Sequence, residues 1–381
     1  MSGTSRTADV IVIGAGIVGA ACAAALARRG LRVLVLEARD AAGGTTGAGM
    51  GHLVVMDDSA AQLALTAWSQ RLWWTLAPEL PPSVEMERCG TLWIAEDDAQ
   101  LQQVRSKQAL YASAGVEAHV LDAQALAEAE PHLRRGLAGA LLVPSDGVLY
   151  QPVATLALLD AARSYGAVVR EGVRVASIGP RSVRTGEGVL QADAIVNAAG
   201  ADAVRLVPAL PILPRKGHLV VTDRHPRLCS HQLVEVGYLH SAHAASGDSV
   251  AFNVQPRATG QVLIGSSRQM AGWEPAVDHD IVRRMVARAR AFMPVLDVVS
   301  IIRIWTGFRP ATPDGLPLIG PWASDDPALE GLWIAAGHEG LGIVTALGTA
   351  ELLADRMIGR TPELDPAPYA PARFAAAPHA T

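Results

Sequence analysis

The sequence of 381 residues is poor in cysteine and in charged residues. Its three cysteines, Cys22, Cys89 and Cys229, form no CxxC or Cys/His spacing, which excludes a zinc site or an iron–sulfur cluster built by this chain alone. Charged residues make up 18% of the chain, and the formal net charge of -5 comes without any lysine- or arginine-rich run. We therefore predict no metal and no nucleic-acid partner. The few cysteines favour a reducing, cytoplasmic compartment.

The sequence also lacks a convincing membrane span. Its longest uncharged apolar stretch, residues 10–27, is divided by Gly14, Gly16 and Gly19 into a β-branched run and an alanine-rich run. This division predicts a buried strand that turns into a buried helix, so we expect no transmembrane segment. Hydrophobic residues at 50% supply a large core, and the length suits two domains.

The amino-terminal residues predict a complete βαβ unit. We expect a strand at 10–13, a helix that ends near Arg29, Gly30 as its left-handed cap, and a strand at 32–36.

A GxGxxG fingerprint occupies the first strand-to-helix turn. Gly14 permits the tight turn, Gly16 leaves room for a pyrophosphate, and Gly19 lets the helix approach the strand. Glu37 ends the second strand, where a carboxylate can accept hydrogen bonds from ribose hydroxyls. We predict a dinucleotide site here, with four neighbouring residues on its wall: Ile17, Val18, Ala38 and Arg39.

NAD would satisfy the same unit, but three features favour FAD. The fingerprint lies close to the amino terminus, and a second glycine-rich segment follows the βαβ unit at 43–52. A distant strand–loop–helix at 333–348 is also placed to meet a large ring. A glycine-rich helix start aimed at a flavin stabilises negative charge that develops on the ring. We predict non-covalent FAD.

The rest of the chain alternates between two kinds of segment. Helices are expected at 60–76, 98–114, 153–165, 279–292 and 343–358. Strands are expected at 91–95, 138–143, 168–178, 194–197, 217–222, 249–254, 261–265 and 332–335, and a loop at 307–320. Trp68, Trp73 and Trp74 have helical spacing, which predicts that they pack in the core.

The chain is expected to leave the domain that contains the βαβ unit twice and to return to it each time. We predict an α/β, Rossmann-like FAD domain of the glutathione-reductase type, formed by residues 1–86, 151–210 and 305–365. Residues 87–150 and 211–304 are predicted to form an α+β substrate domain with a mixed or antiparallel sheet. Residues 366–381 are predicted to be an irregular tail.

Five motifs together resemble the glycine oxidase, sarcosine oxidase and D-amino acid oxidase group of flavoproteins. They are DVIVIGAGIVGAACAAALARRG at 9–30, TTGAGMGHL at 45–53, DAIVNAAG at 193–200, GFRPATPDGLPLIGP at 307–321 and AAGHEGLGIVTALG at 335–348. Within the group, the chain is most similar to the flavin subunits of hydrogen cyanide synthase and D-hydroxyproline dehydrogenase. The resemblance covers essentially the whole chain.

The resemblance implies further cofactor contacts. Thr45, Thr46, Gly49 and Met50 would lie along the pyrophosphate and ring, and Val175 would meet the adenine. The pyrimidine side of the ring would lie against Gly337, His338, Gly340, Leu341, Gly342 and Ile343, and the remaining predicted contacts are Gly51, Ala199, Gly200 and Gly307.

The same resemblance implies a substrate clamp at Arg309. In this group the arginine of the Gly-x-Arg-Pro stretch pairs with the amino acid carboxylate, which a guanidinium matches with two parallel hydrogen bonds. The alternative is that Arg309 braces Asp314 or a flavin edge. Asp314 lies in a Pro-Asp-Gly turn, which favours a structural role.

His52 follows the second glycine-rich segment, in a neighbourhood that faces the flavin in the related enzymes. It either orients the substrate amine or accepts its proton, or else only lines the pocket. No motif requires a covalent flavin bond at His52 or His338.

Two positions depart from the glycine oxidases. Asn253 stands where these enzymes often supply a tyrosine, and Glu339 stands where they have a basic residue near the substrate. Glu339 recognises a cationic or hydroxyl group of the substrate, or is an exposed loop carboxylate. Both departures, with Met50 nearby, predict a different amine substrate.

Three functions stay open at this point. The first is a dehydrogenase or oxidase of small D-amino or imino acids, with D-hydroxyproline as the leading substrate, working by hydride transfer to flavin N5. The second is glycine oxidation, alone or within a cyanide-forming complex. The third is a flavin-bearing subunit that only relays electrons. The narrower relatives imply iron–sulfur partner subunits, and a homo-oligomer is the alternative.

Overall fold

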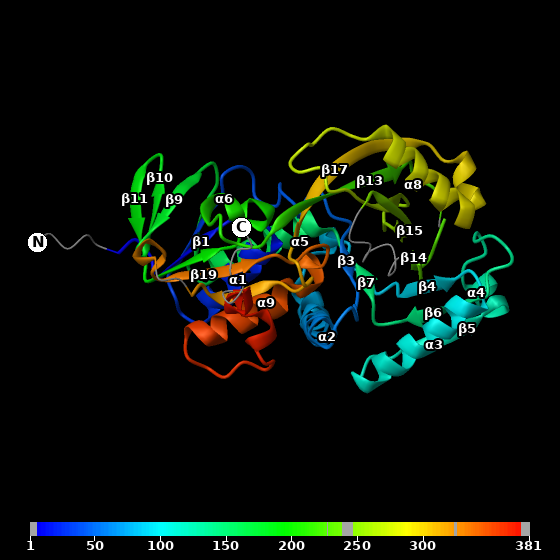
Figure 1. The fold of residues 1–381 in the computed structure, drawn as a ribbon, viewed down its shortest axis with the longest axis horizontal. Helices are drawn as coiled ribbons and strands as arrows, with labels where there is room; N and C mark the ends of the chain where they lie inside the picture. The colour runs from blue at the N-terminus through cyan, green and yellow to red at the C-terminus, as the bar shows by residue number, and fades with distance from the viewer. Residues whose placement is uncertain (1–5, 227, 238–246, 324–325, 375–381) are drawn as a thin grey trace, which may run out of the picture.

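The computed structural model describes residues 6–226, 228–237, 247–323 and 326–374. A six-stranded sheet has the spatial order β18 (Leu318–Pro321), β19 (Leu332–Ala336), β12 (Ala194–Asn197), β1 (Val10–Ile13), β2 (Val33–Leu36) and β8 (Val168–Arg170). An eight-stranded sheet has the order β17 (Ile301–Ala311), β13 (Leu213–Thr222), β16 (Val262–Arg268), β15 (Ser249–Pro256), β14 (Gln232–Glu235), β4 (Thr91–Ala95), β6 (Gly139–Val143) and β5 (His119–Asp122). The two sheets lie toward opposite ends of the long axis (Figure 1).

The remaining elements connect or cover these sheets. One small sheet contains β9 (Val175–Gly179), β10 (Ser182–Thr185) and β11 (Gly188–Gln191). A second small sheet contains β3 (His52–Leu53) and β7 (Gly147–Val148). The helices are α1 (Ile17–Arg28), α2 (Ala60–Leu76), α3 (Asp98–Ser113), α4 (Ala123–Ala129), α5 (Gln151–Ser164), α6 (Ala203–Leu206), α8 (His279–Phe292) and α9 (Gly342–Met357). Short 3-10 helices occur at Ala77–Glu79, Pro82–Val84, Gly200–Asp202, Pro294–Val298, Pro327–Leu329, Ala367–Tyr369 and Pro371–Phe374.

The six-stranded sheet is buried on both faces, which explains why its central strand is apolar at every position. Val10 and Val12 of β1 join the core formed with α1, α5 and α9. Ile11 and Ile13 point the other way, into the core shared with the sheet β9–β11. Strand β1 pairs in parallel with β2 and β12, so the carboxyl ends of these strands meet at one edge. In open α/β sheets, this edge is where ligands bind.

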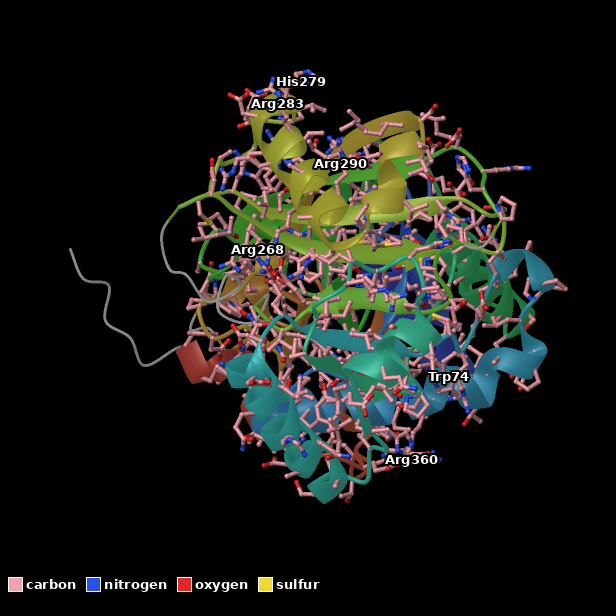
Figure 2. All side chains as sticks on the ribbon, turned by 90° about the vertical axis from the view of Figure 1, so that its right-hand side faces the viewer. Trp74, Arg268, His279, Arg283, Arg290 and Arg360 are labelled. Carbon is pink, nitrogen blue, oxygen red and sulfur yellow. The ribbon has the colours of Figure 1, made fainter. Side chains whose placement is uncertain are left out.

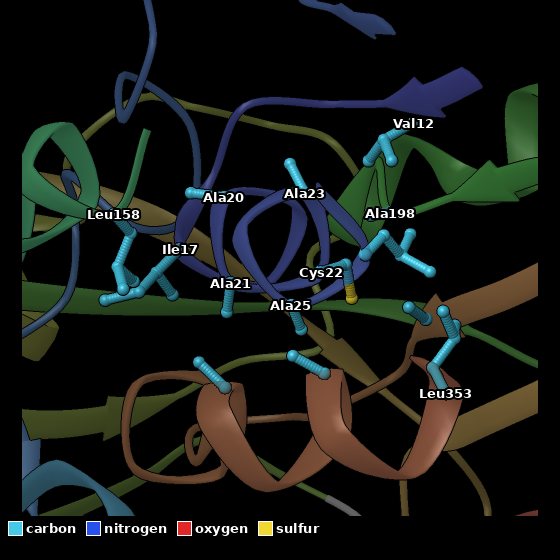
Figure 3. Packing of buried hydrophobic residues seen from close by; sticks show 14 of the residues in the cluster. Val12, Ile17, Ala20, Ala21, Cys22, Ala23, Ala25, Leu158, Ala198 and Leu353 are labelled. Carbon is cyan, nitrogen blue, oxygen red and sulfur yellow. The ribbon is translucent and has the colours of Figure 1, made fainter. Parts of the chain in front are cut away.

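Helix α1 packs closely on its neighbours because its buried face consists mostly of alanine. Ile17 lies beside Leu158 of α5, while Ala21 and Ala25 face α9, which carries Leu353 (Figure 3). Small side chains allow the helix axes to approach, and the alanine-rich run of the sequence thus forms the centre of a helical layer.

One face of the eight-stranded sheet packs under α8, and the other face packs against Met50 of the second glycine-rich segment. Phe252 of β15 stacks on Phe292 of α8 with ring centroids 4.3 Å apart. The alternate residues Leu219 and Leu263 of β13 and β16 instead contact Met50 on the opposite face. Figure 2 shows the charged outer side of α8, with His279, Arg283 and Arg290, and Arg268 below it near the middle of the molecule.

The predicted combination of a Rossmann-like sheet and a mixed second sheet is present. Most strand pairs of the eight-stranded sheet are antiparallel, but β14 pairs with β4 in parallel, and this pair joins the two excursions of the chain. The predicted helices at 60–76 and 279–292 and strands at 91–95 and 194–197 match residue for residue. The predicted strand region 168–178 is divided between β8 and β9.

The predicted loop at 307–320 is wrong at both ends. Residues 307–311 continue β17, which pairs with β13 from Leu213↔Ala311 to Thr222↔Ile301, and residues 318–320 belong to β18. Strand β17 is an edge strand, where Pro310 is tolerated although it has no N–H to donate. Glycine and proline predicted a break, but cross-strand pairing outweighed this local preference. The predicted domain limit at residue 304 falls inside β17, and the domain assignment stays a prediction.

Three further predictions can be compared with the structure. Trp68 and Trp73 are buried and Trp74 is half-buried, so the tryptophans pack as predicted. Part of the tail, residues 367–374, forms two 3-10 helices, and the Tyr369 hydroxyl donates to Ala61 O at 2.7 Å. The rest of the predicted tail, 375–381, lies outside the described residues. No helix within the described ranges is long and apolar enough to cross a membrane.

The α1–α9 contact predicts the effect of a core truncation. Leu353 is 0% exposed in this contact, so Leu353→Ala should lower the free energy of unfolding by about 2–5 kcal/mol in urea denaturation. The control Leu156→Ala removes the same atoms from a helical residue that is 43% exposed, and should change stability by no more than about 0.5 kcal/mol. Equal losses in the two variants would contradict this packing.

Candidate functional site

A cavity of about 510 Å³ runs between the two sheets, along the carboxyl ends of β1 and β2 and under β13 and β17. Its wall contains all but three of the predicted site residues. These wall residues are Gly14, Gly16, Ile17, Val18, Glu37, Ala38, Arg39, Thr45, Thr46, Gly49, Met50, Gly51, His52, Val175, Ala199, Gly200, Asn253, Gly307, Arg309, His338, Glu339, Gly340, Gly342 and Ile343. The fold therefore gathers the predicted residues around one space.

The first glycine turn has no room for side chains. Gly14 has φ 103°, and a Cβ there would lie 2.7 Å from Ala198 O. A Cβ on Gly19 would lie 2.0 Å from Gly14 O, which explains why Gly19 shapes the turn but does not reach the cavity wall. Glu37 accepts hydrogen bonds from Ala15 N and Arg39 N, each at 2.9 Å, so the carboxylate also orders the backbone of the turn.

The second glycine-rich segment is held against both domains. The Thr46 hydroxyl accepts from Ile17 N at 3.0 Å, at the start of α1. The Thr45 hydroxyl donates to Phe308 O at 2.9 Å, and a Cβ on Gly307 would lie 2.5 Å from Ala48 Cβ. Strand β17 therefore rests directly on this segment, and the contact closes one side of the cavity.

Arg309 extends from β17 into the cavity wall. Its Nη1 donates to Ser267 O at 2.9 Å, and a Cβ on Gly217 would lie 2.5 Å from the same nitrogen. The missing side chain at Gly217 is what makes room for the guanidinium. Asp314, the alternative partner considered from the sequence, pairs instead with Arg373 at 2.7 Å and caps Leu316 N, as its turn position predicted.

A buried histidine orders the strand that anchors Arg309. His218 Nε2 accepts from Asp278 N at 3.0 Å, which places the proton of the neutral ring on Nδ1. Nδ1 lies 3.0 Å from Ser267 Oγ, to which it donates, and Ser267 O accepts from Arg309. Burial is the main cause that lowers the pKa of His218. This chain of hydrogen bonds joins α8, β13, β16 and Arg309.

His52 and Asn253 line the cavity, and each has a buried polar atom. Among the described residues, no hydrogen-bond partner is found for His52 Nε2 or Asn253 Oδ1, although both atoms are buried. Burial, together with the positive charge of Arg309, lowers the pKa of His52 to about 4. The imidazole is therefore neutral at pH 7, and both atoms lack the hydrogen bond that a buried polar atom usually makes.

Glu339 lies at the same end of the cavity and is not the exposed loop carboxylate that the sequence left as an alternative. Its side chain is 16% exposed, with Oε1 3.3 Å from Arg215 Nη1 and 3.7 Å from Arg268 Nε. Burial raises the pKa of this carboxyl, but Arg268, Arg309 and Arg215 outweigh burial and hold it below its usual range. Glu339 is therefore ionised.

The last predicted segment forms the start of α9. His338 is 4% exposed, its Nε2 lies 3.0 Å from Thr349 Oγ1, and burial lowers its pKa to about 3. Gly340, Gly342 and Ile343 lie on the cavity wall. Leu341 and Gly337 do not, because Leu341 packs in the core beneath and Gly337 lies against Thr312.

Several wall residues were missed from the sequence. Phe308 could have been predicted, because it adjoins Arg309 in the motif GFRPATPDGLPLIGP. No motif pointed to four other wall residues, Ser266, Trp273, Arg174 and Arg205. Trp273 reaches the wall from an irregular segment after β16, where Arg205 lies 4.7 Å over its ring. Only the folded chain brings these residues together.

Comparison with known proteins agrees with this geometry. The model of the FAD dependent oxidoreductase family matches residues 9–356. The chain belongs to this family. It is 30% identical to hydrogen cyanide synthase subunit HcnC of Pseudomonas aeruginosa, over 99% of this chain and 98% of that protein.

Two solved structures are also similar to this FAD-dependent oxidoreductase. Glycine oxidase from Geobacillus kaustophilus has a TM-score of 0.86 at 27% identity, covering 97% of this chain and 100% of that one. L-proline dehydrogenase from P. horikoshii has a TM-score of 0.86 at 25% identity, covering 97% and 98%. The predicted fold class and the predicted cofactor, FAD, are confirmed by these comparisons.

The cavity of this oxidoreductase fits its cofactor. Gly14 and Gly49 line the cavity at points where the chain packs tightly, since a Cβ on Gly14 would lie 2.7 Å from Ala198 O and one on Gly49 3.2 Å from Ile343 Cδ1. The amino terminus of α1 starts at this wall with Ile17, and the positive end of a helix dipole suits the anionic pyrophosphate. His52 and Asn253, whose buried polar atoms have no partner among the described residues, line the same cavity.

The first glycine turn predicts the effect of a single methyl group. Gly14→Ala combines a left-handed φ with a clash at Ala198 O, so the purified variant should carry less than about one tenth of the wild-type flavin per protein, measured from visible absorbance. Gly186→Ala is the control, because its Cβ would meet nothing within 4 Å. Full flavin content in Gly14→Ala would show that the turn is not part of the cradle.

His338 predicts a loss of stability in acid. The pKa of about 3 in the folded protein lies below the usual 6.5, so the unfolded chain binds more protons between these values and stability falls as pH drops from about 6.5. Between pH 7 and 4.5, the wild type should lose about 2 kcal/mol more than His338→Gln, which keeps a partner for Thr349. Urea unfolding of the two holoproteins measures this, and parallel losses would refute it.

Proposed function

We propose that this chain oxidises small amino or imino acids at the carbon that bears nitrogen, and that D-proline and D-hydroxyproline are its preferred substrates. The observation that carries the proposal is the position of Arg309 on the wall of the cavity that the neutral His52 and the buried Asn253 also line. The names of the similar proteins, glycine oxidase and L-proline dehydrogenase, support an amino or imino acid as substrate.

The proposed role of Arg309 is to bind the substrate carboxylate. A guanidinium carries five N–H donors in a planar fork, and two parallel bonds of this fork match a carboxylate. The packing of Arg309 against Gly217 and the support from His218 through Ser267 hold the fork in one orientation. Fixing the carboxylate fixes the carbon to be oxidised, which is the larger part of what the protein must supply.

His52 and Asn253 are proposed to orient the substrate nitrogen. Asn253 Oδ1 accepts an N–H from the amine, and the neutral His52 bonds the same end of the substrate without adding a positive charge. Because the neutral imidazole carries no negative charge, it does not favour the protonated form of the amine, and the amine can bind uncharged. The substrate nitrogen and the carboxylate are thus held by different sides of the cavity.

FAD is proposed to lie along the remaining wall. Gly14, Gly16, Ile17, Thr45 and Thr46 would hold its pyrophosphate, Glu37 its ribose, and the start of α9 its ring. When bound, FAD supplies the two-electron acceptor, which takes hydride at N5 of its ring. Oxygen or a partner subunit would serve as the final electron acceptor, and the similarity to a hydrogen cyanide synthase subunit favours a partner subunit.

Anaerobic addition of substrate tests the proposal directly. D-proline or a D-hydroxyproline should bleach the bound flavin faster than glycine or sarcosine does. Preferential bleaching by glycine would favour glycine oxidation, and no bleaching by any of the four would favour an electron-relay subunit. Release of hydrogen peroxide in air then distinguishes an oxidase from a dehydrogenase.

Replacing Arg309 tests the carboxylate clamp. Arg309→Met should raise the substrate KM by about 10- to 100-fold because a charge-assisted pair is lost, while flavin content stays unchanged. Arg283→Met is the matched control, since Arg283 is exposed on α8 and pairs with Asp280. An unchanged KM in Arg309→Met would rule out the clamp.

A further inference from the structure

Glu339 has a backbone conformation that its side chain does not favour. Its φ is 49°, in the left-handed region where residues other than glycine are uncommon. The conformation is held by Glu339 N, which donates to Pro310 O at 2.9 Å, and by Gly340 N, which donates to Glu339 Oε2 at 2.5 Å. Strained residues that the surroundings maintain in this way cluster at ligand sites.

Three arginines surround this carboxylate, and only one of them, Arg309, lines the cavity. Arg215 and Arg309 stand directly opposite each other on β13 and β17, and Arg268 ends β16. Like charges at opposed positions of two strands repel, so an anion beside them stabilises the sheet. Arg215 and Arg268 approach Glu339 from outside the cavity wall, whereas Arg309 and Glu339 both belong to it.

The substrate end of the cavity therefore presents one cation and one anion. Arg309 and Glu339 are adjacent, since a Cβ on Gly340 would lie 3.7 Å from Arg309 Nε. The two histidines of the cavity wall, His52 and His338, are neutral at pH 7. A ligand that extends past Arg309 meets an ionised carboxylate whose position is fixed by two arginines and a backbone N–H.

We infer that Glu339 determines substrate specificity, selecting molecules whose distal end carries a hydrogen-bond donor, a hydroxyl or an ammonium group, over molecules that carry a second carboxylate. The carboxylate accepts a hydrogen bond from the donor group, while a second carboxylate at that position is repelled. The preference comes from the bond that the donor group adds, because the carboxylate keeps its contacts with Arg215 and Gly340 N in either case. This inference rests on the proposed function and names the substrate class within it.

The experiment compares four ligands in two pairs, and the members of each pair differ in the group at the distal end. In the wild type, the KM of D-hydroxyproline should be lower than that of D-proline by about tenfold or more. The two imino acids differ by one hydroxyl group. Glu339→Gln should remove most of this preference, and Glu339→Asp, which keeps the charge, should retain part of it. D-ornithine and D-glutamate test an ammonium group and a second carboxylate, and only D-glutamate should bind better to Glu339→Gln than to the wild type.

The control variant is Glu330→Gln, which removes one carboxylate from an exposed ion pair with Arg181 and should leave every ratio unchanged. If Glu339 only neutralises the arginines, its replacement will weaken all ligands equally and keep the ratios, which overturns the inference. If the ratios stay unchanged but D-proline still bleaches the flavin of every variant, the inference about Glu339 fails and the proposed function stands. If no amino or imino acid bleaches the wild type, the proposed function fails before the ratios are measured.

Discussion

The contact between strand β17 and the glycine-rich segment at residues 43–51 is the constraint on which the rest of the site depends. It is made by Thr45 with Phe308 O, by Trp305 Nε1, which donates to Ala48 O at 3.3 Å, and by the absence of a side chain at Gly307. The segment itself is bonded to the start of α1 through Thr46. One contact therefore connects the dinucleotide turn of the first sheet to the strand of the second sheet that carries Arg309.

This arrangement explains why an edge strand carries the proposed substrate clamp. Strand β17 is paired on one side with β13 and covered on the other by the glycine-rich segment, so its edge is not exposed along this half. Main-chain pairing over many residues gives Arg309 a rigid base, and β13 adds Gly217 and His218 beneath it. A loop, as first expected for this segment, would position the guanidinium less well.

The charges of the site follow from the same geometry. Arg309 helps to keep His52 neutral and Glu339 ionised, so a single cation sets the protonation of two neighbours in opposite directions. His218 is kept in one tautomer by a backbone donor, and it passes that order to Arg309 through Ser267. Hydrogen bonds and ion pairs thus hold the side chains of His218, Arg309 and Glu339 in place.

The sequence alone determined the dinucleotide turn, the cofactor class and most of the elements, because these depend on local rules. Gly14, Gly16 and Glu37 act within one βαβ unit, and apolar periodicity marks helices such as 60–76 and 279–292. Only the tertiary structure decided that Arg309 lies on a strand, that Glu339 is buried among arginines, and that Trp273 and Ser267 belong near the site. These features depend on pairing and burial between residues far apart in the chain, which no local pattern records.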